Sequence, residues 1–181
     1  MNKDVEKILV TEEELYSITK KLGEIITNDY AGKKLLVVGV LKGSIYFLTD
    51  LTRHIDLPCH IDFIQASSYG ESTESSGIVK ITKDIAEDLS GFDVLLVEDI
   101  LDTGRTLKHI CDMLSERNPE SIAVVTLLDK PSRRVADIKA DYVGVDVPNE
   151  FVVGYGLDYN QYYRNLPYIG VLRHEVYENM N

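Results

Sequence analysis

The chain has 181 residues, of which 44% are hydrophobic and 27% are charged. That length is enough for one substantial core but short for two, so we expect a single domain over residues 1–181. No apolar run approaches the roughly 20 residues that a membrane-spanning helix needs, and the first residues lack the apolar stretch of a signal peptide. We therefore expect a cytoplasmic protein that has no membrane partner.

The formal net charge is −11, from 19 basic and 30 acidic residues. Such a charge repels nucleic acid and anionic lipid at long range, so nucleic acid is not expected as a partner. Any polyanionic substrate must be met by a metal ion or by local backbone N–H groups. The two cysteines and four histidines have neither a disulfide framework nor a zinc-ligand spacing, so no transition-metal site is expected.

Helical and strand patterns alternate along the chain. Thr11 followed by Glu14 has the pattern of a capping box, and apolar residues then recur at helical spacing up to Asn28. The apolar run 34–41 predicts a strand buried on both faces, and Ser44 is expected to cap a short helix that ends at Leu51. Further strands are predicted at 61–66, 78–82, 94–97, 122–128 and 142–145, the last three of them buried, and a helix is predicted from 105 onward.

Two segments lack a clear period. Residues 67–77 (SSYGESTESSG) are polar and bounded by glycine, which predicts a mobile surface loop. Residues 148–167 are rich in aromatic side chains, and we expect them to form a cap over the sheet. The alternation of buried strands and helices predicts an α/β fold with a mainly parallel, twisted sheet flanked by helices. In such folds ligands bind beyond the carboxyl ends of the strands.

The segment 94–107 (VLLVEDILDTGRTL) carries the strongest chemical signal. A hydrophobic strand is predicted to end at Glu98 and Asp99, and a turn through residues 102–104 leads into the helix. From Asp102 to Thr106 the loop can offer backbone N–H groups, two hydroxyls and the positive end of a helix dipole to a phosphate. The adjacent acids can contact ribose hydroxyls or Mg²⁺. The alternative is a capped helix start with solvated acids.

This segment resembles the phosphoribosyl pyrophosphate motif of the type I phosphoribosyltransferases, in which two acids precede a D-T-G-x-T phosphate loop. The chain has neither a GxxxxGK[ST] nor a GxGxxG pattern, so nucleotide triphosphatase and dehydrogenase functions are disfavoured. More of the chain, about residues 35–172, resembles the hypoxanthine-guanine phosphoribosyltransferases of bacterial type. The matching segments are LKGS (41–44), SSYG (67–70), LLDK (127–130) and the hood segment 146–172.

The resemblance implies a type I phosphoribosyltransferase-like core with a small C-terminal hood, to which the N-terminal part also contributes. It implies a purine-salvage enzyme that converts hypoxanthine and/or guanine and phosphoribosyl pyrophosphate to IMP and/or GMP and pyrophosphate. Mg²⁺ is the implied cofactor, and the purine base and phosphoribosyl pyrophosphate are the implied partners. A homodimer or homotetramer is the expected assembly.

The resemblance also implies a role for each matching residue. Asp102 is expected to take the proton from the imidazole nitrogen of the purine, as a general base in the turn beneath the anomeric carbon. Glu98 and Asp99 are expected to hold the ribose and Mg²⁺, with Asp158 near the base and a second Mg²⁺. The other implied contacts are Thr103, Gly104, Arg105 and Thr106 to the phosphoribosyl group, Lys42, Gly43 and Arg164 to pyrophosphate, Lys130, Phe151 and Val152 to the base, and Ser68 and Tyr69 in the closing loop.

Each role has a structural alternative. Lys42 fits a polar connection between strand and helix, Lys130 fits an ordinary strand end, and Phe151 fits a core or a subunit interface. Some relatives carry basic residues just before the closing loop, but this chain has none at 63–66. For the whole chain, the rivals are a regulator that senses phosphoribosyl pyrophosphate and binds nucleic acid, and transfer to uracil, adenine or orotate.

Overall fold

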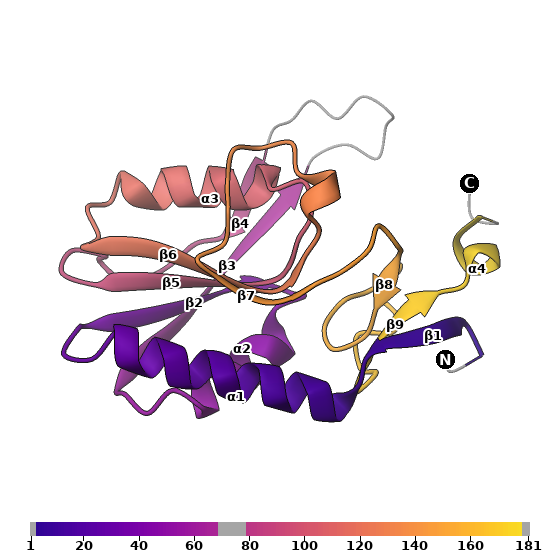
Figure 1. Cartoon of the computed structure of the whole chain (residues 1–181). Coiled ribbons are helices and arrows are strands. Elements are labelled where there is room, and N and C mark those ends of the chain that lie inside the picture. The colour runs from indigo at the N-terminus through magenta and orange to yellow at the C-terminus, as the bar shows by residue number, and fades with distance from the viewer. Residues whose placement is uncertain (1–2, 69–78, 179–181) are drawn as a thin grey trace.

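The computed structural model describes residues 3–68 and 79–178, and its centre is a six-stranded sheet (Figure 1). Four neighbouring pairs are parallel, whereas β4 runs antiparallel to β3 at one edge. The predicted α/β fold with a mainly parallel sheet is thus confirmed. In spatial order the strands are β4 (Val79–Lys83), β3 (Cys59–Ser68), β2 (Leu35–Leu41), β5 (Asp93–Leu101), β6 (Ser121–Asp129) and β7 (Tyr142–Asp146).

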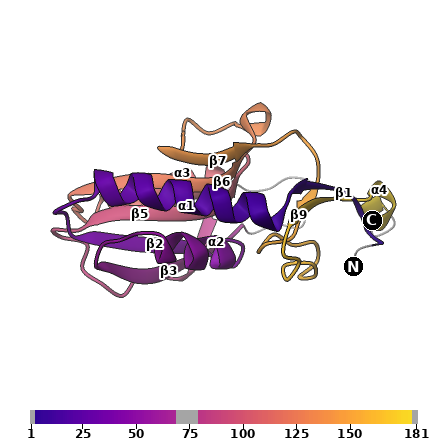
Figure 2. The same cartoon turned by 60° about the horizontal axis from the view of Figure 1, so that its bottom comes forward.

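Helices cover both faces of this sheet. Helices α1 (Glu12–Asp29) and α2 (Ile45–Arg53) lie on one face, and α3 (Arg105–Ser115) lies on the other (Figures 1 and 2). The predicted capping box at the start of α1 is confirmed, because Thr11 Oγ1 accepts from the Glu14 N–H at 3.2 Å and Glu14 Oε2 accepts from the Thr11 N–H at 2.8 Å. This reciprocal pair satisfies two N–H groups that a helix start leaves free.

The predicted cap of α2 is wrong. Ser44 does precede the helix, but its side chain accepts no hydrogen bond there. Its hydroxyl instead donates to the Val40 carbonyl oxygen at 2.7 Å, and the side chain is fully buried. The Ser44 hydroxyl therefore links the turn after β2 to the carbonyl of Val40 near the end of that strand.

Strand β5 is longer than predicted, and the acids lie inside it. The strand continues past Glu98 and Asp99 to Leu101, which is buried and pairs with Asp129 of β6. Because Leu101 is buried, the pairing of β5 with β6 continues beyond the polar residues Glu98 and Asp99. Strand β7 is also less buried than predicted, since it is the edge strand beside β6 and several of its side chains are only partly covered.

A second, three-stranded antiparallel sheet joins the two ends of the chain (Figure 1). Its order is β1 (Val5–Val10), β9 (Ile169–Leu172) and β8 (Val152–Val153), and the short helix α4 (His174–Glu178) follows β9. The expected hood thus exists as a separate sheet, although none of its three strands was predicted. No helix in the described part of the chain is long and apolar enough to cross a bilayer.

Candidate active site

The carboxyl ends of the adjacent strands β2 and β5 open into a cavity of about 290 Å³ beside the hood. The cavity brings together three parts of the sequence that were predicted to act together. Its polar lining comes from the turn after β2, from the end of β5 and the start of α3, and from the hood. These residues are Lys42, Gly43, Glu98, Asp99, Asp102, Thr103, Gly104, Thr106, Asp158 and Arg164.

The predicted phosphate loop connects β5 to α3. Gly104 adopts a left-handed conformation with φ +78° just before the helix, which non-glycine residues rarely adopt. The first turn of α3 leaves its N–H groups without intrahelical partners, so they are available to an anion. Thr103 and Thr106 line the cavity with Gly104, whereas the exposed Arg105 does not belong to the lining.

The two adjacent acids of β5, Glu98 and Asp99, are electrostatically unfavourable when both are ionised. Burial, the neighbouring charge of Asp99 and a side-chain hydrogen bond raise the pKa of Glu98 well above its usual value. Burial also raises the pKa of Asp99, against the opposing effects of the side-chain hydrogen bond with Glu98, of backbone hydrogen bonds and of the charge of Arg164. Two adjacent carboxyl groups in this position retain a proton or attract a cation.

Asp102 is held by a cation from another segment. Arg133 Nε donates to Asp102 Oδ1 at 3.0 Å, and Arg133 lies in the short 3₁₀ helix η1 (Pro131–Arg133) that follows β6. The carboxylate is half-exposed, so it remains accessible to a ligand in the cavity. This pairing was not predicted from the sequence.

A network in the hood connects Lys42 to Arg164. Gln161 Oε1 accepts from Lys42 Nζ and from Arg164 Nη2, each at 3.3 Å. Arg164 also donates to the Gly156 carbonyl at 2.7 Å and pairs with Asp158 Oδ1 at 2.8 Å. Two cations from segments 122 positions apart are thus held side by side, as binding of a pyrophosphate would need.

The hood, the turn after β2 and the acid pair contact one another directly. A Cβ on Gly156, which has φ +104°, would lie 1.9 Å from the Gly43 carbonyl oxygen. A Cβ on Gly43 would in turn lie 1.6 Å from Asp99 Oδ2. Neither position can hold a side chain without displacing its neighbour.

Of the residues predicted to contact the base, Asp158 lines this cavity, whereas Lys130, Phe151 and Val152 lie together outside its lining. Lys130 is 7% exposed, and its Nζ donates to the Glu150 carbonyl at 2.6 Å, next to Phe151. Burial lowers the pKa of Lys130. The ring of Phe151 is 40% exposed and stacks on Tyr177 of α4 at a centroid distance of 5.2 Å, and the buried Val152 begins β8.

The predicted closing loop is only partly within the structure. Ser68 is the last residue of β3, and Tyr69 lies outside the described residues, as do residues 70–77 of the same loop. Their proposed role stays a prediction.

Sequence reasoning missed four residues that organise the site, namely Arg133, Arg134, Gly156 and Gln161. The adjacent pair of arginines two residues after the LLDK segment was a usable signal, because a basic pair close to a predicted ligand-binding residue favours an electrostatic role. Gln161 gave no such signal, since a lone glutamine in an aromatic-rich segment has no distinctive pattern.

Comparisons with known proteins agree on one family. Residues 4–160 match the phosphoribosyl transferase domain family. The hypoxanthine-guanine phosphoribosyltransferase of Streptococcus pneumoniae is 53% identical over 179 residues, which cover 99% of both chains. The corresponding enzyme of Staphylococcus aureus is 54% identical, with 99% of this chain and 100% of that one covered. The chain belongs to the hypoxanthine-guanine phosphoribosyltransferases.

Solved structures support the same assignment. A crystal structure of a hypoxanthine phosphoribosyltransferase from Staphylococcus aureus has a TM-score of 0.95 at 54% identity, covering 98% of this chain and 96% of that chain. A variant hypoxanthine phosphoribosyltransferase from Trypanosoma cruzi, in a ternary substrates complex, has a TM-score of 0.91 at 43% identity, covering 97% and 99%. The type I phosphoribosyltransferase fold of this hypoxanthine-guanine phosphoribosyltransferase family is therefore present.

Proposed function

We propose that the chain transfers the phosphoribosyl group of phosphoribosyl pyrophosphate to hypoxanthine and/or guanine, in a reaction that requires Mg²⁺. The products are IMP and/or GMP and pyrophosphate, as in purine salvage. One observation carries the proposal. A single cavity places the phosphate loop, the acid pair and the linked cations Lys42 and Arg164 opposite one another, with the buried Lys130 nearby in the same part of the fold.

The reaction replaces the bond from the anomeric carbon to pyrophosphate with a bond to a ring nitrogen of the purine. Asp102 accepts the proton that this nitrogen loses, because its carboxylate lines the cavity and Arg133 orients it. As pyrophosphate leaves, positive charge grows on the ribosyl centre, and the nearby carboxylates stabilise it, as they do in glycoside cleavage.

The leaving pyrophosphate is bound from the other side of the cavity. Lys42 and Arg164 supply positive charge, and Gly43, which has no side chain, lets the pyrophosphate approach the backbone closely. The N–H groups of residues 102–106 bind the phosphate at the other end of the substrate. Arg105 contributes through its backbone N–H, since its side chain is exposed.

The chemistry of the acid pair suits Mg²⁺. Among residues 3–68 and 79–178, no three His, Cys, Asp or Glu side chains cluster closely enough to hold a metal ion by themselves. Mg²⁺ usually takes one or two carboxylates and completes its shell with water and substrate phosphates. Glu98 and Asp99 would hold it, with Asp158 on the same cavity, and the ion would neutralise part of the charge on pyrophosphate. Burial raises the pKa values of Glu98 and Asp99, and a cation bound beside the two carboxylates would offset that cost.

We assign the preference for one purine base over another to Lys130 and its neighbours Phe151 and Val152. Its ammonium offers only donors, so it suits the exocyclic oxygen of a 6-oxopurine and not the amino group of adenine. Phe151 offers an exposed ring for stacking, and Val152 offers backbone groups to the ring edge.

We also propose that the protein acts in the cytoplasm as a homodimer or homotetramer, and that residues 1–181 form one domain. Both cysteines are free, which suits a reducing compartment. The exposed rings of Tyr16 and Tyr46 border a second cavity of about 490 Å³, which suits a subunit contact.

The test is an assay of pyrophosphate release with hypoxanthine, guanine, xanthine, adenine and uracil, each with Mg²⁺ and with a chelator. We expect release with the 6-oxopurines alone, and none in chelator while the protein stays folded by circular dichroism. Full activity in chelator would exclude the metal requirement. A regulator would bind phosphoribosyl pyrophosphate without releasing pyrophosphate.

A further inference from the structure

Three consecutive carbonyl groups, those of Leu101, Asp102 and Thr103 before and in the phosphate loop, have their partners in one segment, residues 130–138. The backbone N–H of Lys130 donates to the Leu101 carbonyl at 3.1 Å. The N–H groups of Val135 and Ala136 both donate to the Thr103 carbonyl at 3.1 Å. An anion site built from backbone N–H groups needs its carbonyl oxygens turned away from the anion, because their partial negative charge would repel it.

Arg134 makes the largest share of these contacts. Its Nη2 donates to the Leu101 carbonyl at 2.8 Å, and its Nε donates to the Asp102 carbonyl at 2.9 Å. Nη1 donates to the Ile138 carbonyl at 3.0 Å, and Nη2 also contacts the Asp129 carboxylate. The guanidinium therefore uses all three nitrogens, and only 15% of the side chain is exposed.

The same residue also packs against the tightest point of the loop. A Cβ on Gly104 would lie 3.0 Å from Arg134 Cδ and 2.6 Å from Ile138 Cγ2. Asp129, which Arg134 contacts, directly precedes Lys130. One side chain thus connects the phosphate loop with the strand end that presents the base-reading lysine.

We propose that Arg134 is a positioning residue for the phosphate loop. It holds the Leu101 and Asp102 carbonyl groups away from the cavity, so that the N–H groups of residues 102–106 face the phosphate of the phosphoribosyl group. This inference rests on the proposed function, since it assigns that phosphate to the loop. A lysine cannot replace it, because its compact ammonium cannot reproduce the planar fork of the guanidinium.

The test compares ligands that carry the ribose phosphate with one that lacks it. In Arg134→Lys and Arg134→Gln we expect KM for phosphoribosyl pyrophosphate and Kd for IMP to rise roughly tenfold or more, as the loss of charge-assisted hydrogen bonds implies. Inhibition by inorganic pyrophosphate and KM for hypoxanthine should change much less. Guanidinium ion, added to Arg134→Ala well below unfolding concentrations, should restore part of the affinity for IMP.

Arg117→Gln is the matched control, because Arg117 pairs with Asp84 on the surface at 2.6 Å. It should leave all four constants near wild type. If Arg134→Gln does not fold, Arg134→Lys decides the question. An active wild type whose Arg134→Lys variant binds IMP and phosphoribosyl pyrophosphate normally would overturn this inference alone. A wild type without transfer activity would overturn the proposed function and this inference with it.

Discussion

Gly43 and Asp99 both line the cavity and contact each other directly, since a Cβ on Gly43 would lie 1.6 Å from Asp99 Oδ2. The turn after β2 therefore touches the acid pair of β5, and the Gly156 backbone presses on Gly43 from the hood side. Gly43→Ala should displace Asp99 or the turn itself, and we expect a large loss of kcat/KM for phosphoribosyl pyrophosphate.

The control for this variant is Gly91→Ala. Gly91 has φ +78° with open space around it, so alanine there costs about 1 kcal/mol of stability through backbone strain and touches no ligand. Steady-state kinetics and thermal melting of both variants separate the two effects. Normal turnover in Gly43→Ala would show that Asp99 has room to move.

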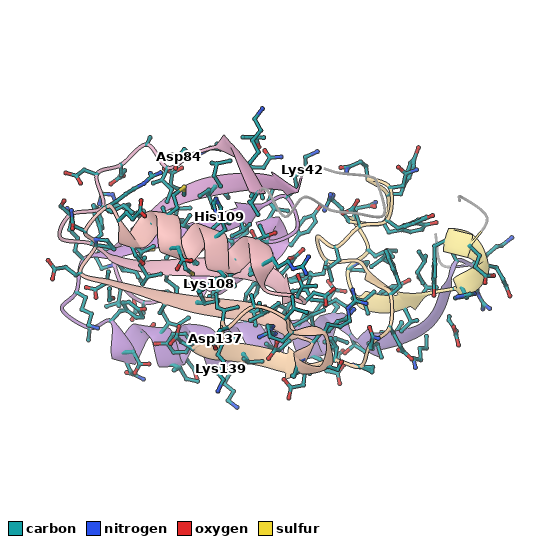
Figure 3. All side chains as sticks on the ribbon, turned by 90° about the horizontal axis from the view of Figure 1, so that it is seen from above. Lys42, Asp84, Lys108, His109, Asp137 and Lys139 are labelled. Carbon is teal, nitrogen blue, oxygen red and sulfur yellow. The ribbon has the colours of Figure 1, made fainter. Side chains whose placement is uncertain are left out.

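Removing the proposed general base should abolish most turnover. In Asp102→Asn we expect kcat to fall on the order of 10²–10⁴, the usual contribution of a general base. The fold should persist, because the amide can still accept from Arg133. Asp112→Asn is the control, since Asp112 is exposed and pairs with Lys108 of α3, which Figure 3 labels. Near-normal single-turnover rates in Asp102→Asn would refute the assignment.

Lys130 should determine the preference for 6-oxopurines over adenine. A buried donor that meets another donor costs roughly 1–3 kcal/mol, so we expect at least tenfold discrimination from this contact. Lys130→Met keeps most of the length and removes the donor, and the ratio of kcat/KM for hypoxanthine and adenine should fall accordingly. Lys139→Met is the control at an exposed position, labelled in Figure 3. An unchanged ratio in Lys130→Met would show that another group reads the base.

The acid pair predicts a pH dependence of stability. The pKa of Glu98 is raised in the folded state, so the folded protein holds this proton more tightly than the unfolded chain. The contribution of Glu98 to the stability of the metal-free protein should then be fully present below the ordinary pKa of 4.5 and be lost as pH rises above it through the raised value. Glu98→Gln should therefore lose less stability than the wild type as pH rises.

Denaturant unfolding across pH, without and with Mg²⁺ and phosphoribosyl pyrophosphate, checks this dependence. At neutral pH Glu98→Gln should equal or exceed the metal-free wild type in stability, yet gain less from the two ligands. Glu120→Gln, at an exposed site, should follow the wild type throughout. A parallel pH profile for Glu98→Gln and wild type would mean that Glu98 ionises normally.

Local patterns in the sequence were sufficient for much of the fold and for the location of the site. The capping box of Thr11 and Glu14 and the apolar run of β2 depend on neighbouring residues alone, and both predictions are confirmed. The D-T-G-x-T loop does lie at a helix start beside the acid pair. The chemical roles of these residues stay predictions.

What sequence reasoning missed depends on distant contacts. Strand β1 alternates weakly and exists because Val5 and Val10 pair with β9, more than 150 positions away. The end of β5 was placed too early because Leu101 is held by Asp129 of another strand. Arg134 acquires its contacts only when residues 130–138 fold over the loop after β5. No local periodicity encodes such pairings.

Because β1 pairs with β9, the sheet of the hood cannot form until residues up to Leu172 have left the ribosome. The strands of the large sheet are all synthesised by Asp146, whereas β9 ends at Leu172. During synthesis β1 must therefore wait, with an unpaired edge, until β9 has been made more than 150 positions later. A ribosome-bound chain can therefore complete the large sheet before the hood sheet, so the two walls of the cavity form at different times.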